Sequence, residues 1–128
     1  MRCLIVDDSA VFIDAARGLL ERQGIAVVGA ASSGAEAIRR FEELRPDVTL
    51  VDIDLGGESG FDVVNQLHRA AAPAPLPLIL ISTHAMQDFA DMVATSPAIG
   101  FVSKSALSAE VIQDLIRASA GFEVGDDR

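Results

Sequence analysis

Short runs of Val, Ile and Leu recur along the chain, and each run is too short to form a buried helix. Because aliphatic and β-branched residues dominate them, we expect these runs to be strands. Between them, apolar residues recur at the three- and four-residue spacing of an amphipathic helix. The predicted strands are 3–6, 25–29, 48–51, 76–81 and 99–102, and the helical spacing covers 12–20, 37–41, 61–67, 86–93 and 111–116. The pattern predicts five consecutive strand and helix units.

Capping and breaking residues mark the helix boundaries. Ser33 and Glu36 have the spacing of a capping box, in which two side chains satisfy the first free N–H groups of a helix. Pro46 is expected to end the second helix, because proline lacks an N–H group and crowds the preceding turn. Gly24 and Gly121 suit helix ends, since glycine tolerates the left-handed conformation common there.

Strands that are almost continuously apolar, alternating with helices, predict a parallel sheet covered on both faces. We therefore expect a three-layer α/β sandwich with right-handed crossovers. In such open sheets, ligands bind beyond the carboxyl ends of the strands. The residues that follow each predicted strand are thus the first candidates for a functional site.

Length and composition fit one ordinary globular domain, because half of the 128 residues are apolar and 23% are charged. We place this domain at 1–120 and interpret 121–128, which lacks helical periodicity, as a C-terminal tail or linker stub. Cys3 lies inside an apolar run and is expected to be a buried small residue. The first apolar run, 3–6, is too short for a signal peptide or a membrane span, so we expect a cytoplasmic protein.

Polar residues follow four of the predicted strands. Asp7 and Asp8 come after the first strand, Asp52 after the third, Ser82 after the fourth and Lys104 after the fifth. All of them should therefore share one edge of the sheet. Three converging carboxylates repel each other unless a cation is held between them, and hard oxygen ligands of this kind suit Mg²⁺ or Mn²⁺.

This set of groups matches what phosphoryl transfer needs, which is an oxygen nucleophile and positive charge near the equatorial oxygens. Asp52 is the candidate nucleophile and would form an acyl phosphate. Asp8, Asp52 and the backbone carbonyl of Asp54 would hold the metal, with Asp7 acting through a metal-bound water. The lysine ammonium would pair with a remaining phosphoryl oxygen, and the serine hydroxyl would hydrogen-bond to the phosphoryl group.

Four motifs carry a specific resemblance: VDD at 6–8, LVDIDL at 50–55, IS at 81–82 and GFVSKS at 100–105. In this order they resemble the receiver domains of two-component response regulators, including those of LuxR-type regulators. The resemblance implies a flavodoxin-like fold with a five-stranded parallel sheet of order 2-1-3-4-5 and five helices. It also implies an aspartyl phosphate, formed from a histidine kinase, a phosphotransfer protein or a small phosphodonor.

The resemblance further assigns a switch and a set of tuning positions. Ser82 and Phe101 stand where receivers carry the hydroxyl and the aromatic residue that reorient on phosphorylation. This change remodels the surface of the fourth helix, fifth strand and fifth helix. Asp54 and His84 stand at positions that tune phosphate lifetime, while Thr83 replaces a smaller residue and narrows access to the phosphoryl group.

The expected partners are proteins. The formal net charge is −9, with 19 acidic and 10 basic residues, so the domain repels nucleic acid backbones. By resemblance, the partners are a histidine kinase or phosphotransfer protein, a second copy in a homodimer, and an output domain or downstream effector. Neither a membrane nor turnover of a substrate is expected.

Two alternatives remain open at this point. A phosphatase of the haloacid dehalogenase type also uses an Asp-x-Asp pair, although its motif ends the first strand and here Asp52 follows the third. A pseudo-receiver would keep the fold as a binding module that phosphate does not switch. The intact acids and Lys104 argue against this second alternative, whereas Thr83 and Ser105, which stands where most receivers have proline, keep it open.

Overall fold

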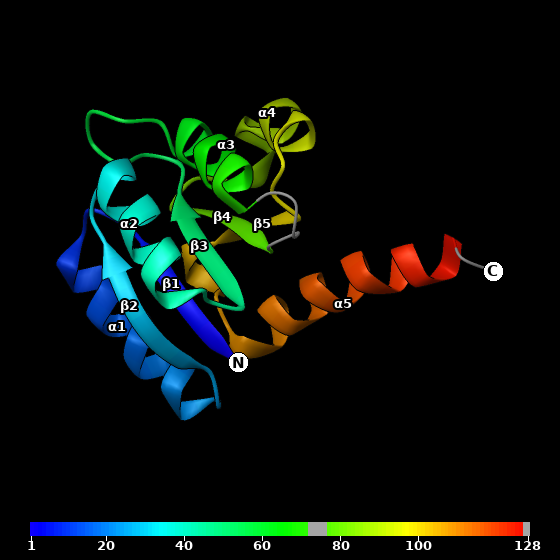
Figure 1. Ribbon diagram of the computed structural model, residues 1–128, viewed down its shortest axis with the longest axis horizontal. Coiled ribbons are helices and arrows are strands. Elements are labelled where there is room, and N and C mark those ends of the chain that lie inside the picture. Colours follow the sequence, from blue (N-terminus) through cyan, green and yellow to red (C-terminus); the bar gives the residue numbers. More distant parts are fainter. Residues whose placement is uncertain (72–76, 127–128) are drawn as a thin grey trace.

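The computed structural model describes residues 1–71 and 77–126, and of Met86 and residues 120–126 only the backbone. Strands and helices alternate along the described chain (Figure 1). The elements are β1 (Arg2–Val6), α1 (Ala10–Arg22), β2 (Ala26–Ala31), α2 (Gly34–Leu44), β3 (Val48–Asp52), α3 (Gly60–Ala71), β4 (Leu78–Ser82), the 3₁₀ turn η1 (Met86–Asp88), α4 (Ala90–Thr95), β5 (Gly100–Ser103), the 3₁₀ turn η2 (Lys104–Ala106) and α5 (Ala109–Asp126).

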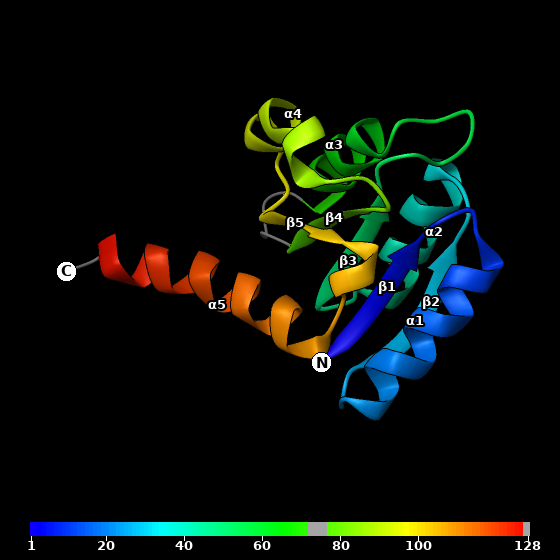
Figure 2. The same cartoon turned by 180° about the vertical axis from the view of Figure 1, so that it is seen from behind.

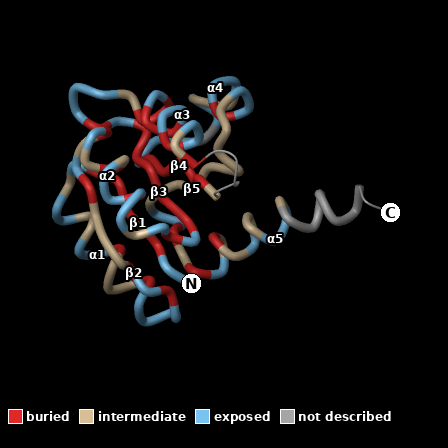
Figure 3. Tube along the Cα trace, viewed as in Figure 1, coloured by how far each residue is buried: buried red, intermediate tan, exposed pale blue. Residues whose placement is uncertain are grey.

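The strands form one parallel sheet of order β2-β1-β3-β4-β5, which confirms the predicted topology. Side chains alternate between its two faces. Leu4 and Val6 of β1 join a core layer with α2 and α3, whereas Cys3 and Ile5 join a second layer with α1 and α5. The helices therefore cover both faces, as the views from front and back show (Figure 2). The buried residues concentrate on the central strands (Figure 3).

The predicted capping box at α2 is present in altered form. The Glu36 N–H group donates to Ser33 Oγ at 3.2 Å, but the Glu36 carboxylate accepts from the N–H group of Ser32 at 2.7 Å instead of that of Ser33. The helix ends at Leu44, just before Pro46, as predicted. Both ends of α2 are thus fixed by local sequence.

Of the two glycines expected at helix ends, one prediction is confirmed and one is wrong. Gly24 follows α1 with φ +94°, a backbone conformation that glycine adopts without strain. A helix end at Gly121 is contradicted, because α5 continues to Asp126. Glycine inside a helix costs only about 1 kcal/mol relative to alanine, so it lowers helix propensity without forcing a stop. The C-terminal part of α5 extends away from the sheet (Figures 1 and 2).

The fourth helix is shorter than its spacing predicts. Residues 86–93 were expected to be helical throughout, but η1 precedes an α4 of six residues. Phe89 at the N-cap makes no side-chain capping hydrogen bond, which leaves the start of the helix weakly defined. Strand bounds differ from prediction by one or two residues at most, and residue 76, the expected start of the fourth strand, lies outside the described residues. Within the described chain, no helix is long and apolar enough to cross a membrane.

Candidate functional site

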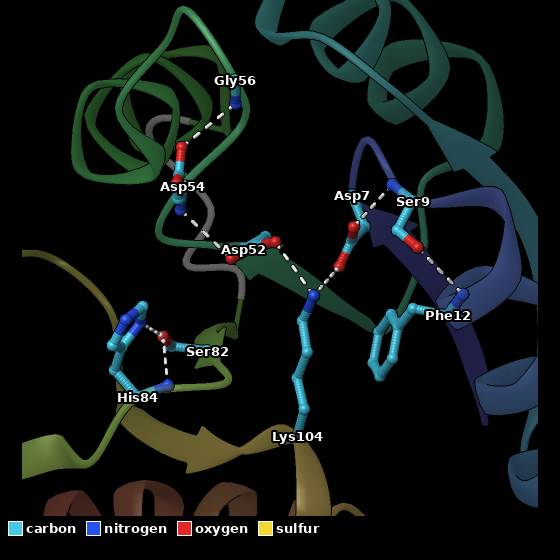
Figure 4. Close-up of polar contacts among 9 residues, drawn as sticks. All are labelled: Asp7, Ser9, Phe12, Asp52, Asp54, Gly56, Ser82, His84 and Lys104. Atoms are coloured by element: carbon cyan, nitrogen blue, oxygen red, sulfur yellow. Dashed lines mark hydrogen bonds and ion pairs between the residues drawn. The ribbon is translucent and has the colours of Figure 1, made fainter.

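Parallel pairing brings the predicted polar residues to one edge of the sheet. Asp7 follows β1, Lys104 follows β5, and Asp52 and Ser82 are the last residues of their strands, one position earlier than predicted. Lys104 Nζ lies 2.6 Å from Asp7 Oδ2 and 3.0 Å from Asp52 Oδ2 (Figure 4). Residues 45 or more positions apart in sequence therefore form one polar group at the carboxyl ends of the strands.

Three carboxylates are gathered at this edge. Asp7, Asp8 and Asp52 each offer an oxygen, and these oxygens lie within 4.8 Å of one another. Asp7 is fully buried and Asp52 is 6% exposed, whereas Asp8 is open to solvent. Buried carboxylates are costly unless a positive charge compensates them. The combination of two buried acids and one accessible acid fits a divalent cation that enters from solvent.

Lys104 supplies the positive charge in the described structure. Burial by itself lowers the pKa of Lys104, but hydrogen bonds and charges from Asp7 and Asp52 outweigh burial and raise it. Burial raises the pKa of Asp52, and the charge of Asp7 adds to this effect despite the opposing contacts from Asp54 and Lys104. One ammonium group thus leaves part of the burial cost of Asp52 uncompensated.

The loop after β3 holds the Asp52 side chain in a fixed orientation. The Asp54 N–H group donates to Asp52 Oδ1 at 3.1 Å, so the two carboxylate oxygens of Asp52 have different partners. The exposed Asp54 side chain turns away and accepts from the Gly56 N–H group at 3.1 Å. Gly56 has φ +75°, which confirms that this loop uses glycine for its turn.

Ser82 reaches the same edge but makes its hydrogen bonds elsewhere. Its Oγ accepts from the His84 N–H group at 3.0 Å and lies 3.5 Å from His84 Nδ1 (Figure 4). The His84 ring packs edge-on against Phe89 with 6.1 Å between centroids. Thr83 is exposed, and Phe101 is half-buried against the core layer of α2 and α3. The structure therefore brings Asp7 and Asp52 into direct contact with Lys104. The hydrogen bonds of Ser82 are instead to His84, and Phe101 packs against the core.

Sequence reasoning missed Gly60, which lies directly against the backbone of Asp52. A Cβ atom at Gly60 would lie 2.0 Å from the Asp52 carbonyl oxygen. The Gly60 N–H group donates to Ile53 O at 2.6 Å. Only glycine allows this approach at the start of α3. The sequence marks this glycine as one of several in a loop, and the contact that singles it out exists only in the folded chain.

Phe12 was also missed, because it was interpreted only as part of an amphipathic helix. Lys104 Nζ lies 4.3 Å from the centroid of the Phe12 ring, within the range of a cation–π contact. No sequence signal connects the first turn of α1 to the residue after β5.

An acidic site at the carboxyl edge of an open parallel sheet defines a class of ligand-binding α/β domains. Within that class, the model of the response regulator receiver domain matches residues 3–117, and the chain belongs to this family. The match confirms the resemblance seen in the motifs. It also favours a signalling domain of a two-component system over a haloacid dehalogenase phosphatase.

Similar proteins support the same family. The DNA-binding transcriptional activator EvgA of Escherichia coli (strain K12) is 29% identical over 122 residues, which cover 95% of this chain and 59% of EvgA. The chain thus spans about three fifths of that relative.

Two solved structures share the fold. A LuxR-family two-component response regulator from Aurantimonas sp. SI85-9A1 has a TM-score of 0.79 and 30% identity, covering 94% of this chain and 85% of that one. The response regulator domain of Thermotoga maritima CheB has a TM-score of 0.72 and 27% identity, covering 92% of each chain.

Proposed function

We propose that Asp52 accepts a phosphoryl group and that the resulting aspartyl phosphate switches binding to a protein partner. One observation carries this proposal, which is the environment of the nearly buried Asp52 carboxylate. One of its oxygens accepts a hydrogen bond from the Asp54 N–H group and the other contacts Lys104 Nζ. Two further acids lie beside it. A nucleophile so oriented, with positive charge beside it, suits in-line phosphoryl transfer.

The acidic group fits a resident Mg²⁺ or Mn²⁺ ion. Asp8, Asp52 and the backbone carbonyl of Asp54 would hold it, and Asp7 would act through a bound water. When bound, the ion would neutralise charge on the transferring phosphoryl oxygens. The accessible Asp8 beside the buried Asp7 and Asp52 supports this assignment, because the site can be filled from solvent without unfolding.

The bonds that form and break involve only the donor and the Asp52 carboxylate. An Asp52 oxygen attacks the phosphorus atom, and the P–N bond of a phosphohistidine or the P–O bond of an acyl phosphate breaks. The bonding electron pair leaves with the donor, and the imidazole or carboxylate that departs takes it up. Lys104 neutralises a phosphoryl oxygen during transfer. Later, water attacks the same phosphorus atom and returns inorganic phosphate and the free Asp52 carboxylate.

The conformational response would involve Ser82 and Phe101. The Ser82 hydroxyl now accepts from His84 and would turn to the phosphoryl oxygen, which adds about −1.5 to −2 charges. Phe101 is half-buried against the core layer of α2 and α3, and its ring would follow the hydroxyl. Asp54, Thr83 and His84 are exposed and, by the resemblance to receivers, would set access and phosphate lifetime. The surface of α4, β5 and α5 would then change its affinity for a partner.

The wider role follows from these assignments. The donor would be a histidine kinase, a phosphotransfer protein or a small phosphodonor, in the cytoplasm and away from membranes. The phosphorylated form would homodimerise or regulate an output domain or effector, without turning over a substrate. The net charge of −9 supports a protein partner over nucleic acid. The division into a domain at 1–120 and a tail at 121–128 stays a prediction.

The test is incubation with acetyl phosphate or beryllofluoride, with and without Mg²⁺, followed by intact mass for the former and NMR for the latter. We expect one added phosphoryl group and shifted amide signals, both dependent on Mg²⁺ and lost in Asp52→Asn. Asp14→Asn, which changes an exposed aspartate on α1, serves as the matched control. No response at saturating donor would indicate a pseudo-receiver. Repeated hydrolysis of a phosphate ester, abolished equally by Asp54→Asn, would indicate a phosphatase.

A further inference from the structure

The ammonium group of Lys104 is enclosed by three side chains. Asp7 and Asp52 contact it at 2.6 and 3.0 Å, and the face of the Phe12 ring lies 4.3 Å away (Figure 4). Only 13% of the Lys104 side chain is exposed. A lysine has a flexible four-carbon stem and a strongly hydrated charge, so it takes up one position only when its surroundings exclude the others. The aromatic face is the one uncharged group among these neighbours.

Phe12 is fixed by the same residue that fixes Asp7. Ser9 is the N-cap of α1, and its Oγ accepts from the Phe12 N–H group at 3.2 Å. Its own N–H group donates to Asp7 Oδ1 at 2.8 Å. Ser9 therefore holds both Phe12 and Asp7 at the start of α1, and both of these residues contact Lys104.

We propose that Phe12 is a positioning residue that keeps the Lys104 ammonium group beside Asp52, where it meets the incoming phosphoryl group. This inference rests on the proposed function, because it assigns a purpose to Lys104 in phosphoryl transfer. Phosphorylation of Asp52 would replace a carboxylate partner of Lys104 by a phosphoryl oxygen. The ring contact involves no group that reacts, so it persists while the ion pair changes partner.

The experiment must distinguish the packing of the Phe12 ring from the attraction between this ring and the Lys104 ammonium group. Phe12 also packs against the core layer of α1 and α5, so Phe12→Leu alters both contacts. Ring fluorination separates them, because it weakens the negative face of the ring while leaving its shape almost unchanged. Site-specific incorporation of phenylalanines with increasing numbers of ring fluorines at position 12 provides such a series. The same series at Phe61, whose ring neighbour is Phe89, is the matched control.

The measurement is the initial rate of Asp52 phosphorylation by acetyl phosphate at saturating Mg²⁺, with the free energy of unfolding measured in parallel. We expect the rate to fall progressively with fluorination at position 12, by about three- to tenfold across the series, while the protein stays folded throughout. At position 61 the rate should not change. A flat series at position 12, or an equal fall at both positions, overturns the role of Phe12. Absence of phosphorylation in the unmodified protein instead overturns the proposed function, and with it the purpose assigned to the ring.

Discussion

The Glu58 side chain reaches from the loop after β3 to the first residue of α2, where its Oε1 accepts a hydrogen bond of 2.8 Å from the Gly34 N–H group. A Cβ atom on Gly34 would lie 2.7 Å from Glu58 Oε2, so a larger residue at position 34 would displace the Glu58 side chain. A carboxylate at a helix N-terminus is stabilised by the free N–H groups and the helix dipole. The same loop carries Asp54, whose N–H group orients Asp52.

Glu58→Ala should therefore loosen the loop as well as the helix end. We expect the free energy of unfolding to fall by about 1 kcal/mol. The Mg²⁺ concentration that half-saturates the site should rise, because Asp54 loses a restraint. Urea unfolding and an NMR titration with Mg²⁺ measure the two effects. Glu42→Ala, at an exposed site on the same helix, should change neither; equal behaviour of the two variants would contradict the loop restraint.

Gly60→Ala should strongly destabilise the folded protein. The added Cβ would lie 2.0 Å from the Asp52 carbonyl oxygen, and backbone atoms on both sides cannot move aside as a flexible side chain would. We expect a loss of about 3 kcal/mol or more, together with a displaced Asp52. Gly57→Ala is the control, because a Cβ there meets no atom within 4 Å. Urea unfolding of both variants decides the matter, and a Gly60→Ala protein as stable as Gly57→Ala would contradict the close approach.

Stability should depend on pH through Asp52. Because burial raises the pKa of Asp52 in the folded state, the folded protein holds this proton at pH values where the unfolded chain has lost it. Stability from Asp52 is thus fully present below the ordinary aspartate pKa and is lost as pH rises through the raised pKa. Urea unfolding across this window in a metal chelator should show wild-type protein losing stability relative to Asp52→Asn. A difference of the opposite sign would contradict the direction of the shift.

Removal of Lys104 should make the protein depend on a divalent cation. Lys104→Ala leaves the fully buried Asp7 without its ammonium partner, and breaking a buried ion pair costs about 3–5 kcal/mol when no other charge replaces it. We expect a lower melting temperature in chelator and a larger stabilisation by Mg²⁺ than in wild-type protein. Arg117→Ala, at an exposed ion pair on α5, should show neither effect. A Lys104→Ala variant indifferent to Mg²⁺ would argue against a cation site at the three acids.

The fold was predictable because its signals are local. Val, Ile and Leu runs mark the strands, and capping by Ser33 and the stop before Pro46 mark one helix. The acids and Lys104 were predictable as a group, since parallel strands place their carboxyl ends at one edge. The continuation of α5 past Gly121 was not predicted, because one glycine lowers helix propensity only weakly against its neighbours.

The residues that support the acids escaped prediction for a different reason. Gly60 matters through a backbone contact, Glu58 through a hydrogen bond to another helix, and Phe12 through a ring that meets a lysine 92 positions later. None of these contacts leaves a periodic or motif-like trace, because each depends on how separate elements pack. Sequence alone therefore placed the acids and Lys104 together more readily than it found the residues that support them.

The unequal contacts of the Asp52 carboxylate give its two oxygens separate identities. In a free carboxylate, a half-turn about the terminal bond exchanges the oxygens many times before any reaction. Here the same rotation must release both the Asp54 amide and the Lys104 ammonium group. If Asp52 accepts a phosphoryl group as proposed, that group therefore meets two chemically distinct oxygens, one bonded to a backbone amide and one beside an ammonium group.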